Sequence, residues 1–132
     1  METPEHPLAE EGYALMGAAF EVHNVLGGGL AEEIYQQSLE LELGLREIPY
    51  RRKQQLQVYY KGALLDVKYV PDFVVYDRIV VELKSLSSLC GEHEAQLMNY
   101  MRVTRSPIGY LINFGPIGKL EYKRIVCSEY SS

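Results

Sequence analysis

Two carboxylates and a lysine interrupt an otherwise apolar β-hairpin in the middle of this chain. Residues 70–73 read Val-Pro-Asp-Phe and residues 81–84 read Val-Glu-Leu-Lys, with apolar residues on either side of a polar turn between them. Such runs predict strands that are apolar on both faces, so Asp72, Glu82 and Lys84 are expected to be desolvated. Charges in that position must pair with one another or hold a metal ion.

The register of this hairpin decides whether the two acids meet. A loop of two residues, 77–78, places Asp72 opposite Leu83, with the two carboxylates on opposite faces. A loop of three residues, 76–78, places Asp72 opposite Glu82, roughly 5 Å apart at Cβ. The sequence alone is compatible with both loops.

Two interpretations fit a close pair of acids. Neighbouring carboxylates repel, and a divalent cation is the usual way to keep both ionised. The alternative is a salt-bridge cluster of Asp72 and Glu82 with Lys84, which shares a face with Glu82 two positions away on the same strand. Spacing alone leaves both interpretations open.

Length and composition limit the class of protein. At 132 residues, the chain is expected to form a single domain over residues 1–132, without a linker or internal repeat. It has no apolar run of membrane-spanning length and begins with acidic residues, so we expect a cytoplasmic protein with no membrane partner. Cys90 and Cys127 lie far apart, which favours reduced thiols over a disulfide or a zinc site.

The charge of the chain argues against one kind of partner. A formal net charge of −5 disfavours strong nonspecific binding to nucleic acid, although it does not exclude a nuclease. We interpret the local positive charges as solvated surface runs. They occur at Arg46, at Arg51-Arg52-Lys53, and at Lys119, Lys123 and Arg124.

Hydrophobic periodicity and turn signals predict the order of elements. Helices are predicted over residues 8–26, 31–45 and 91–104, with a run of three glycines ending the first. Strands are predicted over residues 54–60, 63–76, 79–85, 108–114 and 120–126, with a tight turn at Lys61-Gly62. The expected order is αα-βββ-α-ββ.

Four short segments together resemble the motifs of a known family. Residues 29–35 match the pattern that names the GxxExxY protein family, and residues 22–29 before them are also similar to it. Pro71-Asp72 and residues 82–84 resemble the PD-(D/E)xK motif of the nuclease superfamily in which that family is placed. Residues 93–100 resemble the family's third block, whose Gln and Tyr are similar to the QxxxY motif of recombination nucleases.

The resemblance covers almost the whole chain and implies a fold and a function. It implies an α/β fold of restriction-endonuclease-like type, with an αβββαβ core at about residues 13–126 and a mixed central sheet flanked by helices. The implied function is a metal-dependent nuclease that hydrolyses nucleic-acid phosphodiester bonds, with Mg²⁺ or Mn²⁺ as cofactor and DNA as the expected substrate. The alternative is a noncatalytic nuclease-fold interaction module, expected to be a homodimer.

The resemblance also implies roles for individual residues. Asp72, Glu82 and the backbone carbonyl of Leu83 would bind the metal, in keeping with the preference of hard cations for oxygen ligands. Lys84 would orient or deprotonate the attacking water and offset negative charge on the phosphate. Glu32 would complete the metal shell, although its spacing also fits a carboxylate placed at a helix N-terminus by the macrodipole. Glu32 shares a helix face with residues expected to meet the sheet, namely Tyr35, Gln36, Leu39 and Leu43.

The third predicted helix carries a polar stripe. His93, Gln96 and Tyr100 recur at i, i+3 and i+7 and therefore lie on one face. They could hydrogen-bond Lys84, the waters of the metal or a substrate phosphate. We assign Gln96 and Tyr100 to the catalytic set, whereas His93 fits a polar seam beside the core. A homodimer is also expected, because the strand edges of so small a sheet need cover.

Overall fold

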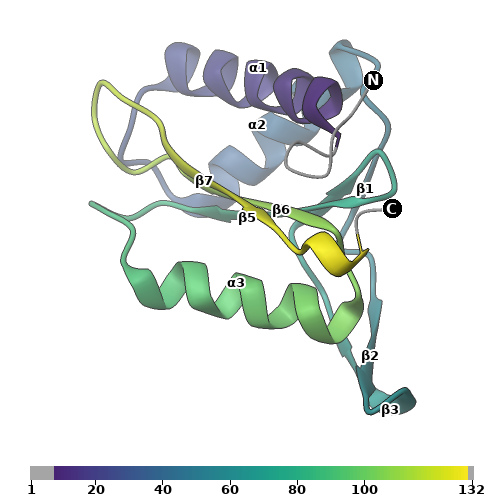
Figure 1. The fold of residues 1–132 in the computed structure, drawn as a ribbon. Coiled ribbons are helices and arrows are strands. Elements are labelled where there is room, and N and C mark those ends of the chain that lie inside the picture. The colour runs from purple at the N-terminus through teal and green to yellow at the C-terminus, as the bar shows by residue number, and fades with distance from the viewer. Residues whose placement is uncertain (1–7, 131–132) are drawn as a thin grey trace.

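The computed structural model describes residues 8–130, and its three α-helices agree with the predicted ones (Figure 1). The helices are α1 (Ala9–Leu26), α2 (Glu32–Leu45) and α3 (Gly91–Thr104), and a 3₁₀ helix, η1 (Ser128–Tyr130), ends the described span. The strands are β1 (Tyr50–Arg52), β2 (Leu56–Tyr60), β3 (Ala63–Tyr69), β4 (Phe73–Val75), β5 (Ile79–Lys84), β6 (Ile108–Asn113) and β7 (Glu121–Val126). Each α-helix begins and ends within one residue of its prediction.

The apolar face of α1 explains both its formation and its position. Leu15, Ala18, Ala19 and Val22 recur at helical spacing and are buried against the sheet. The helix ends at Gly27, whose φ of 76° lies in the left-handed region that glycine adopts without strain. The glycine run therefore lets the chain turn into α2, which packs beside α1.

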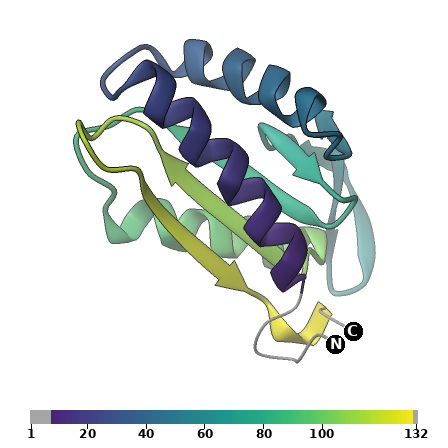
Figure 2. The same cartoon turned by 90° about the horizontal axis from the view of Figure 1, so that it is seen from above.

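Five strands form a mixed sheet in the order β1-β4-β5-β6-β7. β5 and β6 are parallel, and the other neighbours are antiparallel. The parallel pair needs a crossover connection, which α3 provides. Figure 1 shows α1 and α2 on one face of the sheet and α3 on the other, and Figure 2 shows α1 lying across the strands. This is the α/β architecture with a mixed, helix-flanked sheet that the sequence predicted.

The alternation of side chains along β5 places the charged residues. Val81 and Leu83 are buried in the larger core, which the sheet shares with α1 and α2. Val80 belongs to the smaller core under α3. Glu82 and Lys84 have the parity of Val80, so they lie on the α3 face at the carboxyl end of the strand.

The prediction of one continuous strand over residues 63–76 is wrong. β3 ends at Tyr69 and β4 begins at Phe73, and the two strands belong to different sheets. Pro71 lies between them, and because it has no N–H and a fixed φ it cannot continue a ladder of hydrogen bonds. β1 was not predicted, since its Tyr-Arg-Arg sequence has no apolar alternation. The observed order is αα-βββββ-α-ββ.

β2 and β3 form a separate two-stranded ribbon with the predicted turn at Lys61-Gly62. The ribbon extends away from the main sheet in Figure 1 and is inserted between β1 and β4. Its two ends meet where the N–H of Lys53 donates to the carbonyl of Asp72, at 3.1 Å. The guanidinium of Arg105, just after α3, stacks over the Tyr59 ring at 4.1 Å and joins the ribbon to the body.

Within residues 8–130, no helix has the length and apolar character needed to cross a membrane.

Cys90 is exposed at the start of α3, Cys127 is buried after β7, and both thiols are free, as their spacing predicts.

Candidate active site

The turn between β4 and β5 has three residues, and it brings the two acids together. Phe73 pairs with Val81 and Val75 with Ile79, a register that sets Asp72 opposite Glu82. The backbone N–H of Asp72 donates to Oε1 of Glu82 at 3.0 Å. Of the two loops compatible with the sequence, the structure therefore has the one that pairs the carboxylates.

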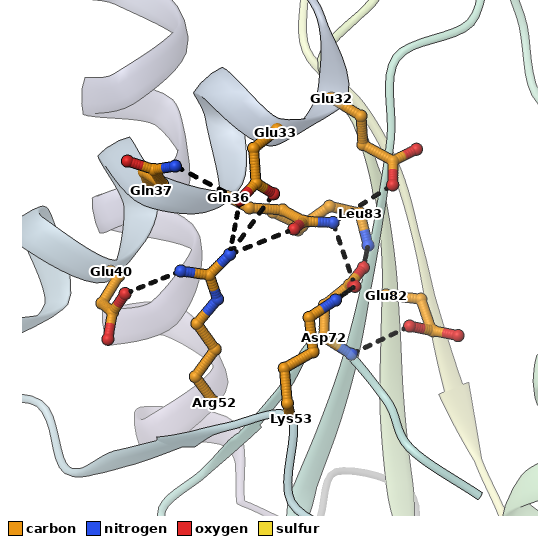
Figure 3. A network of polar contacts seen from close by, with 10 residues as sticks. All are labelled: Glu32, Glu33, Gln36, Gln37, Glu40, Arg52, Lys53, Asp72, Glu82 and Leu83. Carbon is orange, nitrogen blue, oxygen red and sulfur yellow. Dashed lines mark hydrogen bonds and ion pairs between the residues drawn. The ribbon is translucent and has the colours of Figure 1, made fainter.

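The carboxylate of Asp72 is almost fully buried and accepts hydrogen bonds from three segments (Figure 3). Oδ2 accepts from the backbone N–H of Leu83 at 2.8 Å. Oδ1 accepts from Nε2 of Gln36 at 3.1 Å and from Nζ of Lys53 at 3.2 Å. These donors fix the orientation of the carboxylate.

Gln36 connects Glu32 to Asp72. Its Nε2 donates to Oε2 of Glu32 at 3.1 Å as well as to Asp72, and the side chain is buried. Its Oε1 accepts from Arg52, which also forms ion pairs with Glu33 at 3.0 Å and with Glu40 at 3.1 Å. Arg52 thus fixes the orientation of the Gln36 amide, and the amide nitrogen bonds to both Glu32 and Asp72.

Glu82 has the most perturbed carboxyl group of the site. Burial, followed by the negative charge of Asp72, raises the pKa of Glu82 to about 7. The hydroxyl of Tyr69 has no hydrogen-bond partner within normal geometry in residues 8–130, yet it faces Glu82 closely enough to lower that pKa in part. Glu82 is therefore a half-buried acid whose negative charge is opposed by that of Asp72.

Glu32 lies at the first turn of α2, on the side that faces the sheet. The residue is exposed, but its carboxyl group is partly shielded, and this shielding followed by the charge of Asp72 raises the pKa of Glu32. The positive charges of Lys84 and Lys53 act in the opposite direction. The predicted third acid is thus in the electrostatic range of both Asp72 and Lys84.

Lys84 ends β5, two positions after Glu82 and on the same face. Its positive charge lowers the pKa of Glu82 and of Glu32. Within residues 8–130, its ammonium group makes no hydrogen bond or ion pair with the protein. Lys84 therefore contributes positive charge to the site without forming an ion pair. This arrangement differs from the salt-bridge cluster of Asp72, Glu82 and Lys84 that the sequence also allowed.

The predicted stripe on α3 is only partly connected to the site. The ring of Tyr100 stacks on that of Tyr69, with centroids 4.2 Å apart and planes 9° from parallel, so Tyr100 reaches Glu82 through Tyr69. Gln96 is exposed and has no hydrogen bond to a site residue among the described residues. His93 accepts a hydrogen bond from the N–H of Cys90 at 3.1 Å and caps the start of α3.

Sequence reasoning did not identify three residues that the structure places in the site: Gln36, Lys53 and Tyr69. Gln36 follows Glu32 by one helical turn, a spacing that indicates a shared face but no particular bond. Residues 51–53 were interpreted as a solvated run, and Lys53 is exposed, but Arg52 is half-buried and both side chains also bond to the site network. No sequence signal marks Lys53, since its contact with Asp72 depends on the ribbon inserted between them.

The fit of this site to a metal ion can be judged from its donors. Within residues 8–130, no three His, Cys, Asp or Glu side chains are gathered closely enough to form a metal cluster. The paired acids Asp72 and Glu82 nevertheless offer carboxylate oxygens, which a hard cation prefers as ligands. Burial and then the charge of Asp72 raise the pKa of Glu82, and a cation would relieve the second of these two effects. The donor set therefore suits a hard divalent ion.

A family model described as the PD-(D/E)XK nuclease superfamily matches residues 9–125. Among solved structures, the chain is similar in fold to one titled "Crystal structure of SSO0001", with a TM-score of 0.54 and 22% sequence identity. That similarity covers 71% of this chain and 48% of the other, so this chain spans about half the length of SSO0001. No curated protein matches the chain.

Proposed function

The chain belongs to the PD-(D/E)XK nuclease superfamily, and from this premise we propose that it is a metal-dependent nuclease of restriction-endonuclease-like fold. The observation that carries the proposal is the register of β4 and β5, in which Asp72 lies opposite Glu82 and Lys84 follows on the same face. We place the chain in the GxxExxY branch of the superfamily on the strength of residues 29–35.

Asp72, Glu82 and the backbone carbonyl of Leu83 would hold Mg²⁺ or Mn²⁺, with Glu32 as a further carboxylate. The N–H of Leu83 points to Asp72, and in a strand the N–H and C=O of one residue point to the same edge, so the carbonyl faces the site as well. When bound, the ion would polarise the phosphoryl oxygens and lower the pKa of a water. Glu82 would then remain ionised, because the cation offsets its repulsion by Asp72.

Lys84 would act on the attacking water and on the phosphate. Its ammonium group has no protein partner in the described residues, and it lies near enough to Glu82 and Glu32 to lower their pKa values. In this position it would orient the water and stabilise the negative charge that develops on the phosphate oxygens. Tyr100 would contribute through the stacked ring of Tyr69, and Gln96 would contact the substrate from the exposed face of α3.

The test combines metal binding with cleavage. We expect calorimetric titration to detect Mn²⁺ binding to the parent chain and no binding to Glu82→Ala, while Glu21→Ala, an exposed acid on α1, binds as the parent does. Single-stranded, double-stranded and branched DNA, and RNA, are then incubated with metal to find the substrate. Equal Mn²⁺ binding by the parent and by Glu82→Ala would show that the ion does not bind where we place it.

A second candidate function is a noncatalytic interaction module, and one observation favours it. The strand β3 is exposed along residues 63–68, including Leu64, Leu65 and Val67. An exposed strand edge with aliphatic side chains can pair with another chain, and a second copy is the partner we propose. Sedimentation should then reveal a dimer that Leu65→Lys dissociates, whereas a monomer at every concentration would contradict this.

A further inference from the structure

We infer that a groove beside the active site binds the sugar-phosphate backbone of a nucleic-acid strand, with Lys119 and Lys123 as its phosphate contacts. This inference rests on the proposed nuclease function and extends it, because it states where the substrate strand lies and what the protein recognises in it. The groove has a volume of about 510 Å³ and lies between the segment after β5 and the strand β7. Ser87 and Ser88 line it together with the two lysines.

The position of the groove follows from the register of the sheet. Lys84 pairs with Asn113 across β5 and β6, and Asn113 pairs with Glu121 across β6 and β7. Glu121 lines the groove, so the groove lies two strands away from Lys84, on the order of 10 Å at the usual strand spacing. A strand of a few nucleotides that entered the active site could therefore continue directly into the groove.

The wall between the two sites is held in place by hydrogen bonds. Asn113 is fully buried, its Oδ1 accepts from the N–H of Leu86 at 2.8 Å, and its Nδ2 donates to the carbonyl of Leu86 at 3.0 Å. These bonds fix the segment that leads from Lys84 to Ser87 and Ser88. The serine hydroxyls are thus presented at a defined place, as donors available to a phosphate oxygen.

The charges of the groove favour an anion. Lys119 and Lys123 are exposed, and neither ammonium has an ion-pair partner within residues 8–130. Glu121 is the acid that faces the groove, but its Oε1 accepts from Nδ2 of Asn113 and from the N–H of Leu89, each at 2.9 Å. These bonds orient the carboxylate, which also interacts with the charge of Lys123. With two lysines and one glutamate the groove carries a net charge of +1, and both ammonium groups can reach a ligand.

The chemistry of the groove indicates what kind of recognition it provides. Lysine ammonium groups act as point charges and serine hydroxyls as single donors, and both suit phosphate oxygens rather than the edges of particular bases. Backbone contacts of this kind position a strand without reading its sequence. The expected ligand is therefore a nucleic-acid strand bound through its phosphates, with little dependence on sequence. Such local charge is also needed for binding, because the whole chain is acidic.

The experiment measures binding without cleavage. A fluorescein-labelled single strand of about 16 nucleotides is titrated with protein in EDTA, and anisotropy gives the association constant at salt concentrations from about 50 to 200 mM. The test variant is Lys119→Gln/Lys123→Gln. The matched control is Lys61→Gln/Lys68→Gln on the β2–β3 ribbon, which removes the same charge from exposed positions. Circular dichroism confirms that each variant is folded.

We expect the slope of log K against log salt to become shallower by about 1.4 in the test variant, since each phosphate contact to a single strand contributes about 0.7. The control should keep the slope of the parent. An unchanged slope in the test variant, an equal loss in the control, or no binding by the parent would each overturn the inference. The nuclease proposal is judged separately by Mn²⁺ binding and cleavage. If the parent cleaves nucleic acid but the salt dependence is unchanged in the test variant, the groove inference is wrong and the nuclease proposal stands.

Discussion

At the scale of single residues, the buried carboxylate of Asp72 connects three segments of the chain. It accepts hydrogen bonds from α2 through Gln36, from the chain after β1 through Lys53, and from β5 through Leu83. A buried donor left without its acceptor costs about 1–3 kcal/mol, so the bonds from the buried Gln36 and Leu83 matter to the folded state as well as to any metal. Gln36 is the donor with the strictest geometric requirement, because its one amide nitrogen donates to both Asp72 and Glu32.

Replacement of Gln36 by Glu tests this bridge. The variant places a third carboxylate between Glu32 and Asp72, both of which lose a donor, so we expect the free energy of unfolding in EDTA to fall by roughly 2 kcal/mol or more. The control is Gln37→Glu on the exposed face of the same helix, which should change stability by less than about 0.5 kcal/mol. Urea unfolding measures both variants. Similar losses for Gln36→Glu and Gln37→Glu would mean that the bridge contributes little.

The raised pKa of Glu82 makes a prediction about pH. Its pKa is about 7 in the folded protein and near 4.5 when unperturbed, so between these values the folded state holds a proton that the unfolded state has released. Stability in EDTA should therefore fall as pH rises through this window, by up to about 3 kcal/mol at the upper end. Urea unfolding of the parent and Glu82→Gln at several pH values measures this contribution, because other titrating groups are common to both. Parallel pH profiles would show that Glu82 titrates normally.

At the scale of elements, the end of β3 and the middle of α3 meet beside the site. Tyr69 ends β3 and stacks on Tyr100 of α3, and its buried hydroxyl faces Glu82. The stack thus connects the inserted ribbon, the crossover helix and the charged end of β5. A hydroxyl buried without a full hydrogen bond is a cost to the folded state, and such a cost is most easily understood if the group serves the carboxylate that it faces.

Tyr69→Phe separates the stability and the function of this hydroxyl. The ring and its stack remain, so we expect the free energy of unfolding in EDTA to stay equal or to rise by up to about 1 kcal/mol, because a poorly satisfied buried group is removed. Mn²⁺ binding should weaken several-fold, since Glu82 loses the hydroxyl group that lowers its pKa. Tyr59→Phe, whose hydroxyl bonds only the exposed Gln57 at 2.9 Å, is the control. Unchanged Mn²⁺ affinity in Tyr69→Phe would leave the hydroxyl without a role in the site.

The elements also show which parts of the structure the sequence could predict. The helices and the last two strands follow from local periodicity and from glycine and proline punctuation, so their bounds were predicted closely. The break at Pro71 was missed because the apolar character of residues 63–76 outweighed the one residue that cannot continue a ladder. The acid pair was predictable once a loop length was chosen, whereas the bond from Lys53 depends on the ribbon that returns the chain to Asp72.

At the scale of the whole molecule, the site joins segments that are distant in the chain. Glu32 comes from α2, Asp72 from the start of β4 and Glu82 from β5, and the β2–β3 ribbon is inserted just before Asp72. In the absence of a cation, burial, followed by the negative charge of Asp72, raises the pKa values of Glu82 and Glu32. A bound cation would therefore be expected to stabilise the contacts among α2, β4 and β5 rather than one local segment.

Thermal unfolding tests this coupling between the ion and the fold. A ligand that binds only the folded state stabilises it by about 2.7 kcal/mol at a concentration near 100 times its Kd, which for a chain of this size raises Tm by roughly 8 °C. We expect Mn²⁺ to produce such a rise in the parent and none in Asp72→Asn, which keeps the side-chain volume but loses the charge. Because two of the donors to Asp72 come from α2 and from the chain before the ribbon, the whole transition should move as one step. A rise in Tm that persists in Asp72→Asn would mean that the ion stabilises the fold from another site.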